Sequence, residues 1–339
     1  MRRWAWMLVV TSLALVLSVT VGCSHSTQIV SVWPAASTEA TIVAPAGSST
    51  WPLMGTVQRS SAGQRAPIAA LYAAQSPGAP APSGSAGAIG GVGSADVVYE
   101  WGSTRTATQV LALFQSSLPA DTGALGMSNA SAQVVAGQYA AVLCSLGGGG
   151  AGTAGAVAPA TFPGLFGGTP PGGAPGVYLL ARKAGTVLPH PAAAGTGTAR
   201  LFFGGSADST QPIASITVPV APGSPVTWEF QRKEGSYLRT VQGDDARDSL
   251  SGKVISVRNL LVMWARPVQD DSRTNTGQLS LTGQGQVSVF RDGVRSAGHW
   301  LAPPDGPPRL TADDGSVILL APGSTWFEIV PLTANITLK

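Results

Sequence analysis

The alternation of apolar and polar residues changes character about halfway along the chain. In the first half, apolar runs at 68–73 and 96–101 predict strands, and the continuous apolar run at 139–146 is typical of a strand buried on both faces. Apolar residues at helical spacing predict a helix over 107–117 and a second helix over 130–138. Strands and helices therefore mix in this half, which predicts an α/β unit.

The second half is predicted to form strand after strand, without helical periods. The predicted strands are 177–182, 199–203, 213–218, 226–232, 237–242, 254–265, 287–290, 297–301, 317–320 and 326–330. Asp292-Gly293 and Asp314-Gly315 predict tight hairpin turns, because Gly readily adopts the positive φ that such turns need. We therefore expect a mixed α/β (α+β) fold, with an N-terminal α/β domain and a β-rich C-terminal domain that ends in a β-meander.

Stretches of low complexity suggest where the domains begin and end. The chain has 43 Gly and 26 Pro, and only 11% of its residues are charged, which favours turns and short strands over long helices. The Ser, Thr, Ala and Pro of residues 23–63 predict a flexible tether, and the Gly/Pro-rich residues 147–176 predict a mobile insertion that packs no core. Domains are then expected at 64–205 and 206–339.

The first residues predict export from the cytoplasm. Two arginines precede the uncharged run 4–21, as in a signal peptide spanning 1–22. Thr20-Val21-Gly22-Cys23 resembles the lipobox of bacterial lipoproteins, in which the Cys thiol receives a diacylglyceryl group. Cys23 is therefore the predicted lipidation site, and the lipid would hold the chain on the outer face of the cytoplasmic membrane. Ordinary cleavage and an uncut membrane anchor are the alternatives, and both also place the remaining residues outside.

The second cysteine has two interpretations. Cys144 lies in the apolar run 139–146, where a thiol behaves as a small buried hydrophobic group. A disulfide between Cys23 and Cys144 is the alternative in an oxidising compartment. Acylation of Cys23 would exclude that disulfide.

The charge balance excludes nucleic acid as a partner. Without Arg2 and Arg3, 18 of the 20 basic residues remain, against 17 acidic ones. Nucleic-acid binding needs clustered Lys and Arg to displace counterions from phosphates, and no such cluster follows the leader. The membrane, reached through the lipid anchor, and a cell-wall polymer or another envelope protein are the expected partners.

Known catalytic and metal-binding patterns do not fit this sequence. Of the three histidines, His25 and His190 have no Asp, Glu or Cys at ligand spacing, and His299 precedes Trp300 in a predicted strand, which favours a structural role. The acidic pairs 244–245, 270–271 and 313–314 lie at turns and lack the spacing of a calcium loop. We therefore expect neither a metal site nor catalytic residues.

One stretch matches the residue pattern of a dinucleotide-binding loop but lacks the structural context that such a loop needs. Residues 150–155 read G-x-G-x-x-G after a predicted strand. Pro159 and Pro163 break the helix that should follow, and the chain has no Asp or Glu from Thr122 to Ala207 that could hold a ribose hydroxyl. No cofactor is expected.

A set of short segments, in this order, resembles the YerB-like family of bacterial lipoproteins. The segments are 95–100, 111–115, 237–239, 248–252, 259–262, 283–293, 299–300 and 322–331. The resemblance covers roughly residues 65–331 and is strongest after Val226. It implies a mixed α/β N-terminal domain, a β-rich C-terminal domain and a lipoprotein signal, and it implies no known activity.

The chain departs from this family at three arginines. Family members carry Thr-Arg-Phe where this chain has Thr108-Gln109-Val110, and Gly-Pro-Val-Arg-Ser-Ala-Arg where it has residues 123–129. If those arginines line an anion pocket in relatives, this protein has lost the pocket or moved the charge to Arg105. An inherited N-terminal ligand is therefore in doubt.

Three functions remain open at this point. The first is a non-catalytic binding or assembly module of the cell envelope. The second is a capture protein for a small ligand between the domains, where Asp96, Tyr99, Glu100 and Arg239 could converge. The third is an enzyme acting on wall material, with Asp96 and Glu100 as its carboxylates. Residues four apart on a strand lie about 13 Å apart, beyond the usual separation of catalytic carboxylates.

The candidate site residues also have structural interpretations. Glu100 can form a buried ion pair with Arg105 or with Arg239, and we favour this reading over catalysis. Trp300 and Trp326 are expected on adjacent strands, where they serve the core or stack on a ligand.

Overall fold

Strands are the predominant regular structure of the described chain. The computed structural model describes residues 49–58, 65–73, 89–102, 107–147, 156–188, 200–205, 207, 211–221, 224–268 and 279–339. Within them lie twenty strands, two α-helices and two short 3-10 helices. The fold is therefore mostly β, and the expected α/β character of the first half is only loosely supported.

The strands before residue 200 are β1 (Ser49–Thr50), β2 (Val57–Gln58), β3 (Ile68–Leu71), β4 (Val97–Gly102), β5 (Thr108–Phe114), β6 (Val142–Cys144), β7 (Ala156–Val157), β8 (Phe166–Gly167) and β9 (Tyr178–Leu179). The later strands are β10 (Ser215–Ala221), β11 (Ser224–Gln231), β12 (Ser236–Val241), β13 (Asp244–Asp245), β14 (Ser256–Val257), β15 (Asn259–Ala265), β16 (Gly283–Arg291), β17 (Val294–Ala302), β18 (Arg309–Thr311), β19 (Thr325–Pro331) and β20 (Thr337–Leu338). The helices are η1 (Val92–Ser94), α1 (Ala130–Gln138), η2 (Pro163–Leu165) and α2 (Ala181–Val187).

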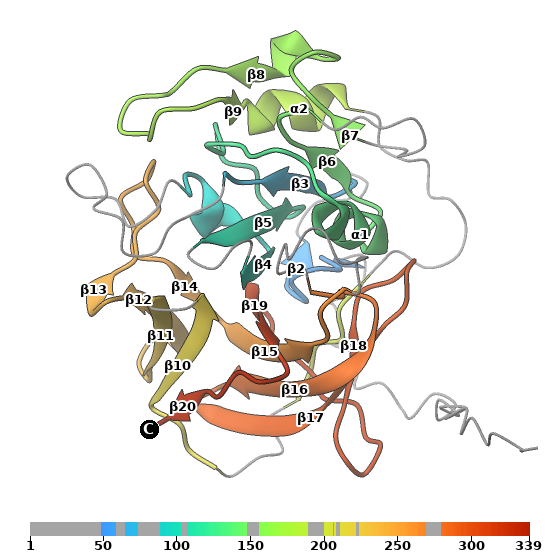
Figure 1. Ribbon diagram of the computed structural model, residues 1–339, viewed down its shortest axis with the longest axis vertical. Coiled ribbons are helices and arrows are strands. Elements are labelled where there is room, and N and C mark those ends of the chain that lie inside the picture. Colours follow the sequence, from blue (N-terminus) through green and yellow to red (C-terminus); the bar gives the residue numbers. More distant parts are fainter. Residues whose placement is uncertain are drawn as a thin grey trace, which may run out of the picture. The chain divides into compact units, whose positions relative to one another are not determined.

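A ten-stranded sheet joins both halves of the sequence. Its order is β18-β17-β16-β15-β19-β4-β5-β3-β6-β7 (Figure 1). The strands β15 to β18 form an antiparallel meander, as expected for the C-terminal part. The strand β19 does not continue the meander. It returns to lie between β15 and β4, parallel to both.

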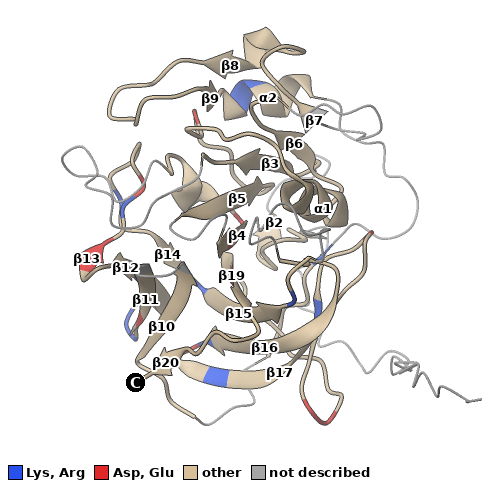
Figure 2. Ribbon diagram, in the orientation of Figure 1, with Lys and Arg blue, Asp and Glu red and all other residues tan. Residues whose placement is uncertain are grey.

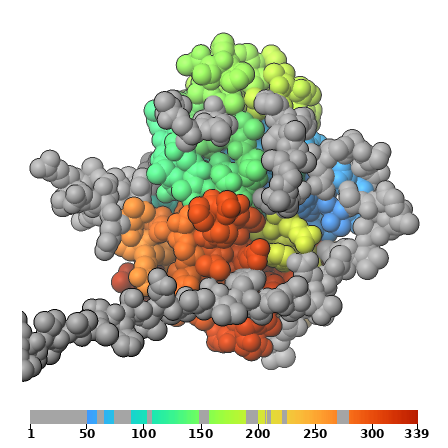
Figure 3. Space-filling view, turned by 90° about the vertical axis from the view of Figure 1, so that its right-hand side faces the viewer, coloured from blue at the N-terminus to red at the C-terminus, as the bar shows by residue number. Residues whose placement is uncertain are grey.

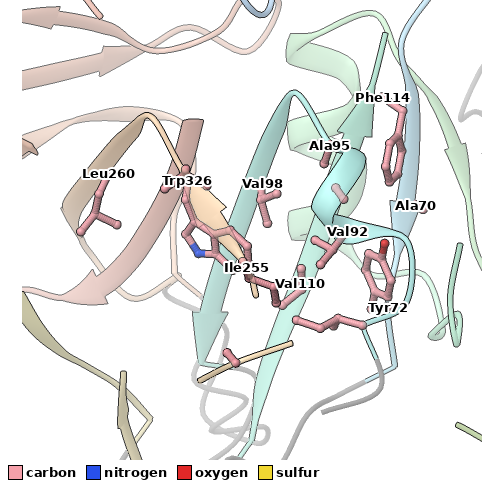
Figure 4. Close-up of a cluster of buried hydrophobic side chains, with 14 of the residues drawn as sticks. Ala70, Tyr72, Val92, Ala95, Val98, Val110, Phe114, Ile255, Leu260 and Trp326 are labelled. Atoms are coloured by element: carbon pink, nitrogen blue, oxygen red, sulfur yellow. The ribbon is translucent and has the colours of Figure 1, made fainter. Parts of the chain in front are cut away.

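A six-stranded antiparallel sheet packs against one face of the large sheet. Its order is β13-β12-β11-β10-β20, with β14 also paired to β12. The strand β10 lies against β19 and β4, and β12 lies against β15. Side chains of both sheets share one apolar core, in which Trp326 lies between Leu260 and Val98 (Figure 4).

The opposite face of the large sheet carries a second core. This core contains the buried face of α1, including Val135, and aromatic side chains such as Tyr99 and Phe327. The helix α1 begins as the sequence predicts, because the side chain of Asn129 accepts a hydrogen bond from the backbone N–H of Ala132 at 2.9 Å. The prediction of a helix over 130–138 is confirmed.

The helix predicted over 107–117 is wrong, since residues 108–114 form strand β5. This strand pairs with β4 on one side and β3 on the other, and all seven of its side chains are buried. A strand that is buried on both faces has apolar residues at nearly every position. Such a run also contains apolar residues at helical spacing, so the pattern does not distinguish a strand from a helix. The continuous apolar run predicted as a buried strand at 139–146 contains β6 and is confirmed in part.

The hairpin predicted at Asp292-Gly293 is confirmed. It joins β16 to β17, and both turn residues have positive φ, 55° for Asp292 and 77° for Gly293. The turn at Asp314-Gly315 is also present, with a φ of 84° at Gly315. Local turn chemistry therefore fixed these two reversals of the chain.

Two segments that the sequence marks as unstructured take part in the fold. Residues 49–58, assigned to the tether, pair as β1 and β2 and bury Leu53 completely. Within the predicted insertion 147–176, Val157 and Leu165 are 4% and 3% exposed and belong to the core between the sheets. A few apolar side chains among many Gly and Pro are enough to fix these segments.

Several predictions concern residues outside the described part of the chain. The signal peptide, Cys23, His25, Arg105, the G-x-G-x-x-G stretch 150–155 and His190 fall outside the described residues. All described residues lie in one compact unit, 36–339. Figure 3 shows residues of the first half (green) directly adjoining residues of the last third (orange and red) on the face in view. The domain boundary expected at 205/206 stays a prediction.

Candidate functional site

Two acidic side chains lie next to each other between the two sheets. Glu100 of β4 and Glu328 of β19 are partners in the register of these parallel strands. Neighbouring strands lie about 4.8 Å apart, so both carboxylates leave the large sheet at the same level. Glu100 is 1% exposed and Glu328 is 0% exposed. Such burial of acidic groups requires partners.

The six-stranded sheet supplies these partners from two residues that are also in register. Trp228 of β11 is the cross-strand partner of Arg239 of β12. One nitrogen of Arg239, Nη2, donates to Glu100 Oε1 at 2.9 Å and to Glu100 Oε2 at 3.1 Å. The indole nitrogen of Trp228 donates to Glu328 Oε1 at 2.9 Å. A pair of donors on one sheet thus faces a pair of carboxylates on the other.

Trp326 and Thr108 complete this arrangement. Trp326 precedes Glu328 by two positions and therefore points to the same face of β19. Its ring contacts that of Trp228 edge-on, with centroids 5.2 Å apart, and the guanidinium carbon of Arg239 lies 5.5 Å from its centroid. The Thr108 hydroxyl donates to Glu100 Oε1 at 3.0 Å. We call these six residues the sheet-interface cluster: Glu100, Thr108, Trp228, Arg239, Trp326 and Glu328.

The cluster holds two carboxyl groups and one cation. Burial raises the pKa of Glu328 well above its usual value, and the neighbouring charge of Glu100 raises it further. Arg239 and the hydrogen bond from Trp228 act in the opposite direction but do not cancel these effects. Glu328 therefore retains its proton to a higher pH than an exposed glutamate does.

Paired carboxyl groups also occur in acid–base catalysis. Here the pair is enclosed by the two sheets, and the side chains of Arg239 and Glu100 are only 5% and 1% exposed. A polymer could reach these oxygens only if the sheets separated. The geometry supports the ion pair of Glu100 with Arg239, the structural interpretation that the sequence favoured.

The four residues expected to converge on a small ligand do not converge. Asp96 is buried and accepts hydrogen bonds from the backbone N–H groups of Gln115 at 2.5 Å and Ser116 at 2.7 Å, just after β5 ends. Burial raises the pKa of Asp96, although these hydrogen bonds counteract the rise. Asp96 thus fixes the end of a strand.

Tyr99 points away from the sheet-interface cluster. It lies in the second core, where it stacks on Phe327 with centroids 4.4 Å apart and shares a 2.9 Å hydrogen bond with the hydroxyl of Tyr139. Successive residues of a strand face opposite sides, so Tyr99 and Glu100 cannot share one site. Of the four residues, the structure brings together only Glu100 and Arg239.

Trp300 and Trp326 are both buried, each 1% exposed, but they are not on adjacent strands. Trp300 lies in β17 and belongs to the second core, whereas Trp326 lies in β19 and faces the six-stranded sheet. The indole nitrogen of Trp300 donates to the carbonyl oxygen of Trp264 at 3.1 Å. The prediction failed because β19 leaves the meander and pairs inside the large sheet.

Two of the positions that carry arginine in the YerB-like pattern are in contact. The side-chain nitrogen of Asn129 donates to the side-chain oxygen of Gln109 at 2.6 Å. These residues come from α1's N-terminus and β5, so the fold brings the two positions together although twenty residues separate them. In this chain, two uncharged amide side chains occupy these positions instead of two arginines.

Sequence reasoning missed Glu328 and Trp228. Glu328 is the single acidic residue in the apolar strand Thr325–Pro331, and a lone acid in a buried strand signals a buried partner. Trp228 sits in a strand with no comparable signal, because an indole N–H becomes informative only once its acceptor is known.

The other charged residues of the described chain are few and dispersed over the ribbon (Figure 2). His299 is a surface residue whose Nδ1 lies 3.5 Å from Asp313 Oδ1, with 58% of its side chain exposed. The expectation that His299 is a structural residue and not a catalytic base stays a prediction. Among the described residues, neither helix has the length and apolar character needed to cross a bilayer.

Cys144 is buried and forms no disulfide. Burial raises its pKa to about 12, so the thiolate is scarce at neutral pH. This agrees with the interpretation of Cys144 as a small buried hydrophobic group.

We expect Cys144 to resist thiol reagents in the folded protein. In a Cys23→Ser chain at pH 8, a chromogenic disulfide reagent should modify Cys144 at least about a hundredfold more slowly than in denaturant, because reaction needs local opening. The absorbance of the released thiol gives both rates in one experiment. Rapid modification of the native chain would contradict the burial of Cys144.

Comparison with known proteins supports the resemblance seen in the sequence. Residues 216–327 match the family described as the C-terminal domain of a protein of unknown function, DUF3048. The fold is similar to the crystal structure of the YerB protein from Bacillus subtilis, with a TM-score of 0.67 and 21% identity, over 85% of this chain and 99% of that chain. No curated protein matches the sequence.

The region that matches the family model includes part of the cluster. It includes Trp228, Arg239 and Trp326, ends one position before Glu328, and does not include Glu100. The cluster therefore joins the matched region to a strand from the first half of the chain.

Proposed function

We propose that this YerB-like chain is a lipoprotein of the bacterial cell envelope, anchored through Cys23 on the outer face of the cytoplasmic membrane, whose folded part is a non-catalytic binding or assembly module. The proposed location rests on the N-terminal segment. There, two arginines, the uncharged run 4–21 and Gly22-Cys23 follow one another in the order of a lipoprotein signal peptide. The partner is a wall polymer or another envelope protein.

One observation carries the non-catalytic part of the proposal. The two acids considered for catalysis are committed to structural bonds: Glu100 accepts from Arg239 and Thr108, and Asp96 accepts from the backbone at the end of β5. Both are 1% exposed. A partner would therefore meet the outer surface of the two sheets and not these carboxylates.

The membrane anchor is tested by replacing Cys23. In the native host, the Cys23→Ser chain should lose at least about nine-tenths of its membrane-bound fraction and all incorporation of labelled palmitate, because two acyl chains are needed for stable anchoring. Cys144→Ser is the matched control and should keep both. A Cys23→Ser chain that still carries the label would contradict the proposed lipidation site.

The binding role is tested with the mature lipoprotein and purified wall fragments. We expect retention on sedimented fragments without release of soluble products, and the same retention for Glu100→Gln, once circular dichroism shows that the variant is folded. Glu229→Gln, the same change at an exposed position of β11, is the control. Products that appear with the native chain and disappear with Glu100→Gln would establish an enzyme instead.

A further inference from the structure

Polar atoms without partners are concentrated in the sheet-interface cluster. Five buried side-chain atoms of the described chain have no hydrogen-bond partner, and three of them belong to this cluster: Arg239 Nε, Trp326 Nε1 and Glu328 Oε2. Leaving a buried donor or acceptor unpaired costs the desolvation free energy of that group. Three such atoms at one place call for a shared partner.

The three atoms come from residues that lie against each other. Trp326 and Glu328 occupy the same face of β19, two positions apart. The guanidinium carbon of Arg239, which is bonded to Nε, lies 5.5 Å from the centre of the Trp326 ring. Arg239 also interacts electrostatically with the Glu328 carboxyl group.

The other polar atoms of these residues are already engaged. Glu328 Oε1 accepts from Trp228, and Arg239 Nη2 donates to Glu100. The atoms left over are two N–H donors and Glu328 Oε2, which accepts when the proton that Glu328 retains is held on Oε1, on the side of its register partner Glu100. A partner of all three must accept twice and donate once.

We propose that the cluster binds one water molecule, which accepts hydrogen bonds from Arg239 Nε and Trp326 Nε1 and donates one to Glu328 Oε2. Water has two lone pairs and two protons, and buried waters typically make about three hydrogen bonds to otherwise unpaired groups. A metal cation is disfavoured by the two N–H donors, and a halide is disfavoured by the carboxylate of Glu100 beside the site.

This water belongs to the contact between the sheets. It links Arg239 of the six-stranded sheet to Trp326 and Glu328 of the large sheet, alongside the direct bonds to Glu100 and Glu328. Direct and water-mediated bonds together then satisfy the polar groups of an otherwise apolar interface. The inference concerns the folded core and is independent of the proposed partner and anchor.

The indole N–H signals of the native protein test the proposal. In water-selective nuclear Overhauser spectra, the Trp326 Nε1 proton should show a cross-peak to a long-lived water. The indoles of Trp228 and Trp300 are matched controls, because they are as deeply buried but donate to Glu328 and to the carbonyl of Trp264. They should show no such cross-peak, and Trp326→Phe identifies the signal by its loss.

A crystal structure of the native chain at high resolution provides the second measurement. We expect one density peak within about 2.7–3.2 Å of all three atoms. Absence of both the peak and the Trp326 cross-peak overturns the proposal, as does a direct bond between these atoms. An anomalous bromide signal after soaking overturns it in favour of a halide site. The native chain alone decides the question if Trp326→Phe does not fold.

Discussion

Replacement of Glu328 by Gln is expected to stabilise the protein, and the gain should grow as the pH rises. Glutamine keeps the Oε1 acceptor for Trp228 but carries no charge, and its amide can donate toward Glu100 instead of repelling it. Over the pH interval in which folded Glu328 keeps a proton that the unfolded chain has lost, the native chain loses up to about 1.4 kcal/mol of stability per pH unit, and the Gln variant does not. In a chain of this size, each kcal/mol raises the melting temperature by about 2–4 °C.

The pH dependence follows from the raised pKa of Glu328. Between the ordinary value of 4.5 and the raised value, the unfolded chain has released a proton that the folded chain still holds. The native protein therefore loses stability as the pH increases across this interval and levels off above the folded pKa. Glu328→Gln lacks this contribution.

Thermal unfolding from pH 4 to pH 9 measures this difference. The melting curves of the native chain and Glu328→Gln should diverge as the pH rises. Glu229→Gln makes the same chemical change at an exposed residue and should follow the native curve. A Glu328→Gln chain that is less stable than the native one at pH 8 would show that the carboxylate is ionised and favourably paired.

Replacement of Arg239 by Met should have the largest destabilising effect. Methionine preserves much of the contact with Trp326, but Glu100 and Glu328 are then buried without a cation. Removing one partner of a buried ion pair typically costs about 3–5 kcal/mol. The loss should increase with pH, since the cost falls on the ionised carboxylates.

A double-mutant cycle separates the lost ion pair from lost packing. Arg239→Met combined with Glu100→Gln should recover a large part of the stability, because no unpaired charge remains at that position.

Arg247→Met is the matched control: Arg247 pairs with Asp245 at 3.1 Å, but the two side chains are 48% and 46% exposed. Loss of that pair should cost at most about 1 kcal/mol. Denaturant unfolding at pH 7 measures the native chain, Arg239→Met, Glu100→Gln, their double variant and Arg247→Met. A double variant no more stable than Arg239→Met would mean that packing, and not charge, accounts for the effect.

The hairpin turns and the start of α1 depend on local sequence, whereas the partner of the buried Glu100 does not. Asp292-Gly293 specifies its turn through the φ angles that these two residues adopt, whatever the rest of the chain does. Asn129 likewise marks the start of α1 through one local hydrogen bond. For Glu100, burial in an apolar strand requires a cation, and the sequence offered Arg105 and Arg239 as candidates without deciding between them.

Strand β5 and the placement of β19 show where local sequence fails. An apolar run covers both faces of β5, so its periodicity is compatible with a helix, and only pairing with β3 and β4 makes it a strand. The strand β19 has the local pattern of a meander, yet it inserts between β15 and β4. This insertion sets Glu328 beside Glu100 and separates Trp326 from Trp300.

The sequence by itself determined the turns, most strands, the start of α1 and the burial of Cys144, because each depends on residues close together in the chain. Only the tertiary structure decided which strands are neighbours, and thereby which polar groups meet between the sheets. Glu100 and Arg239 are 139 positions apart, and Trp228 and Glu328 are 100 apart. Contacts at such separations arise from the pairing of whole strands, which no local pattern encodes.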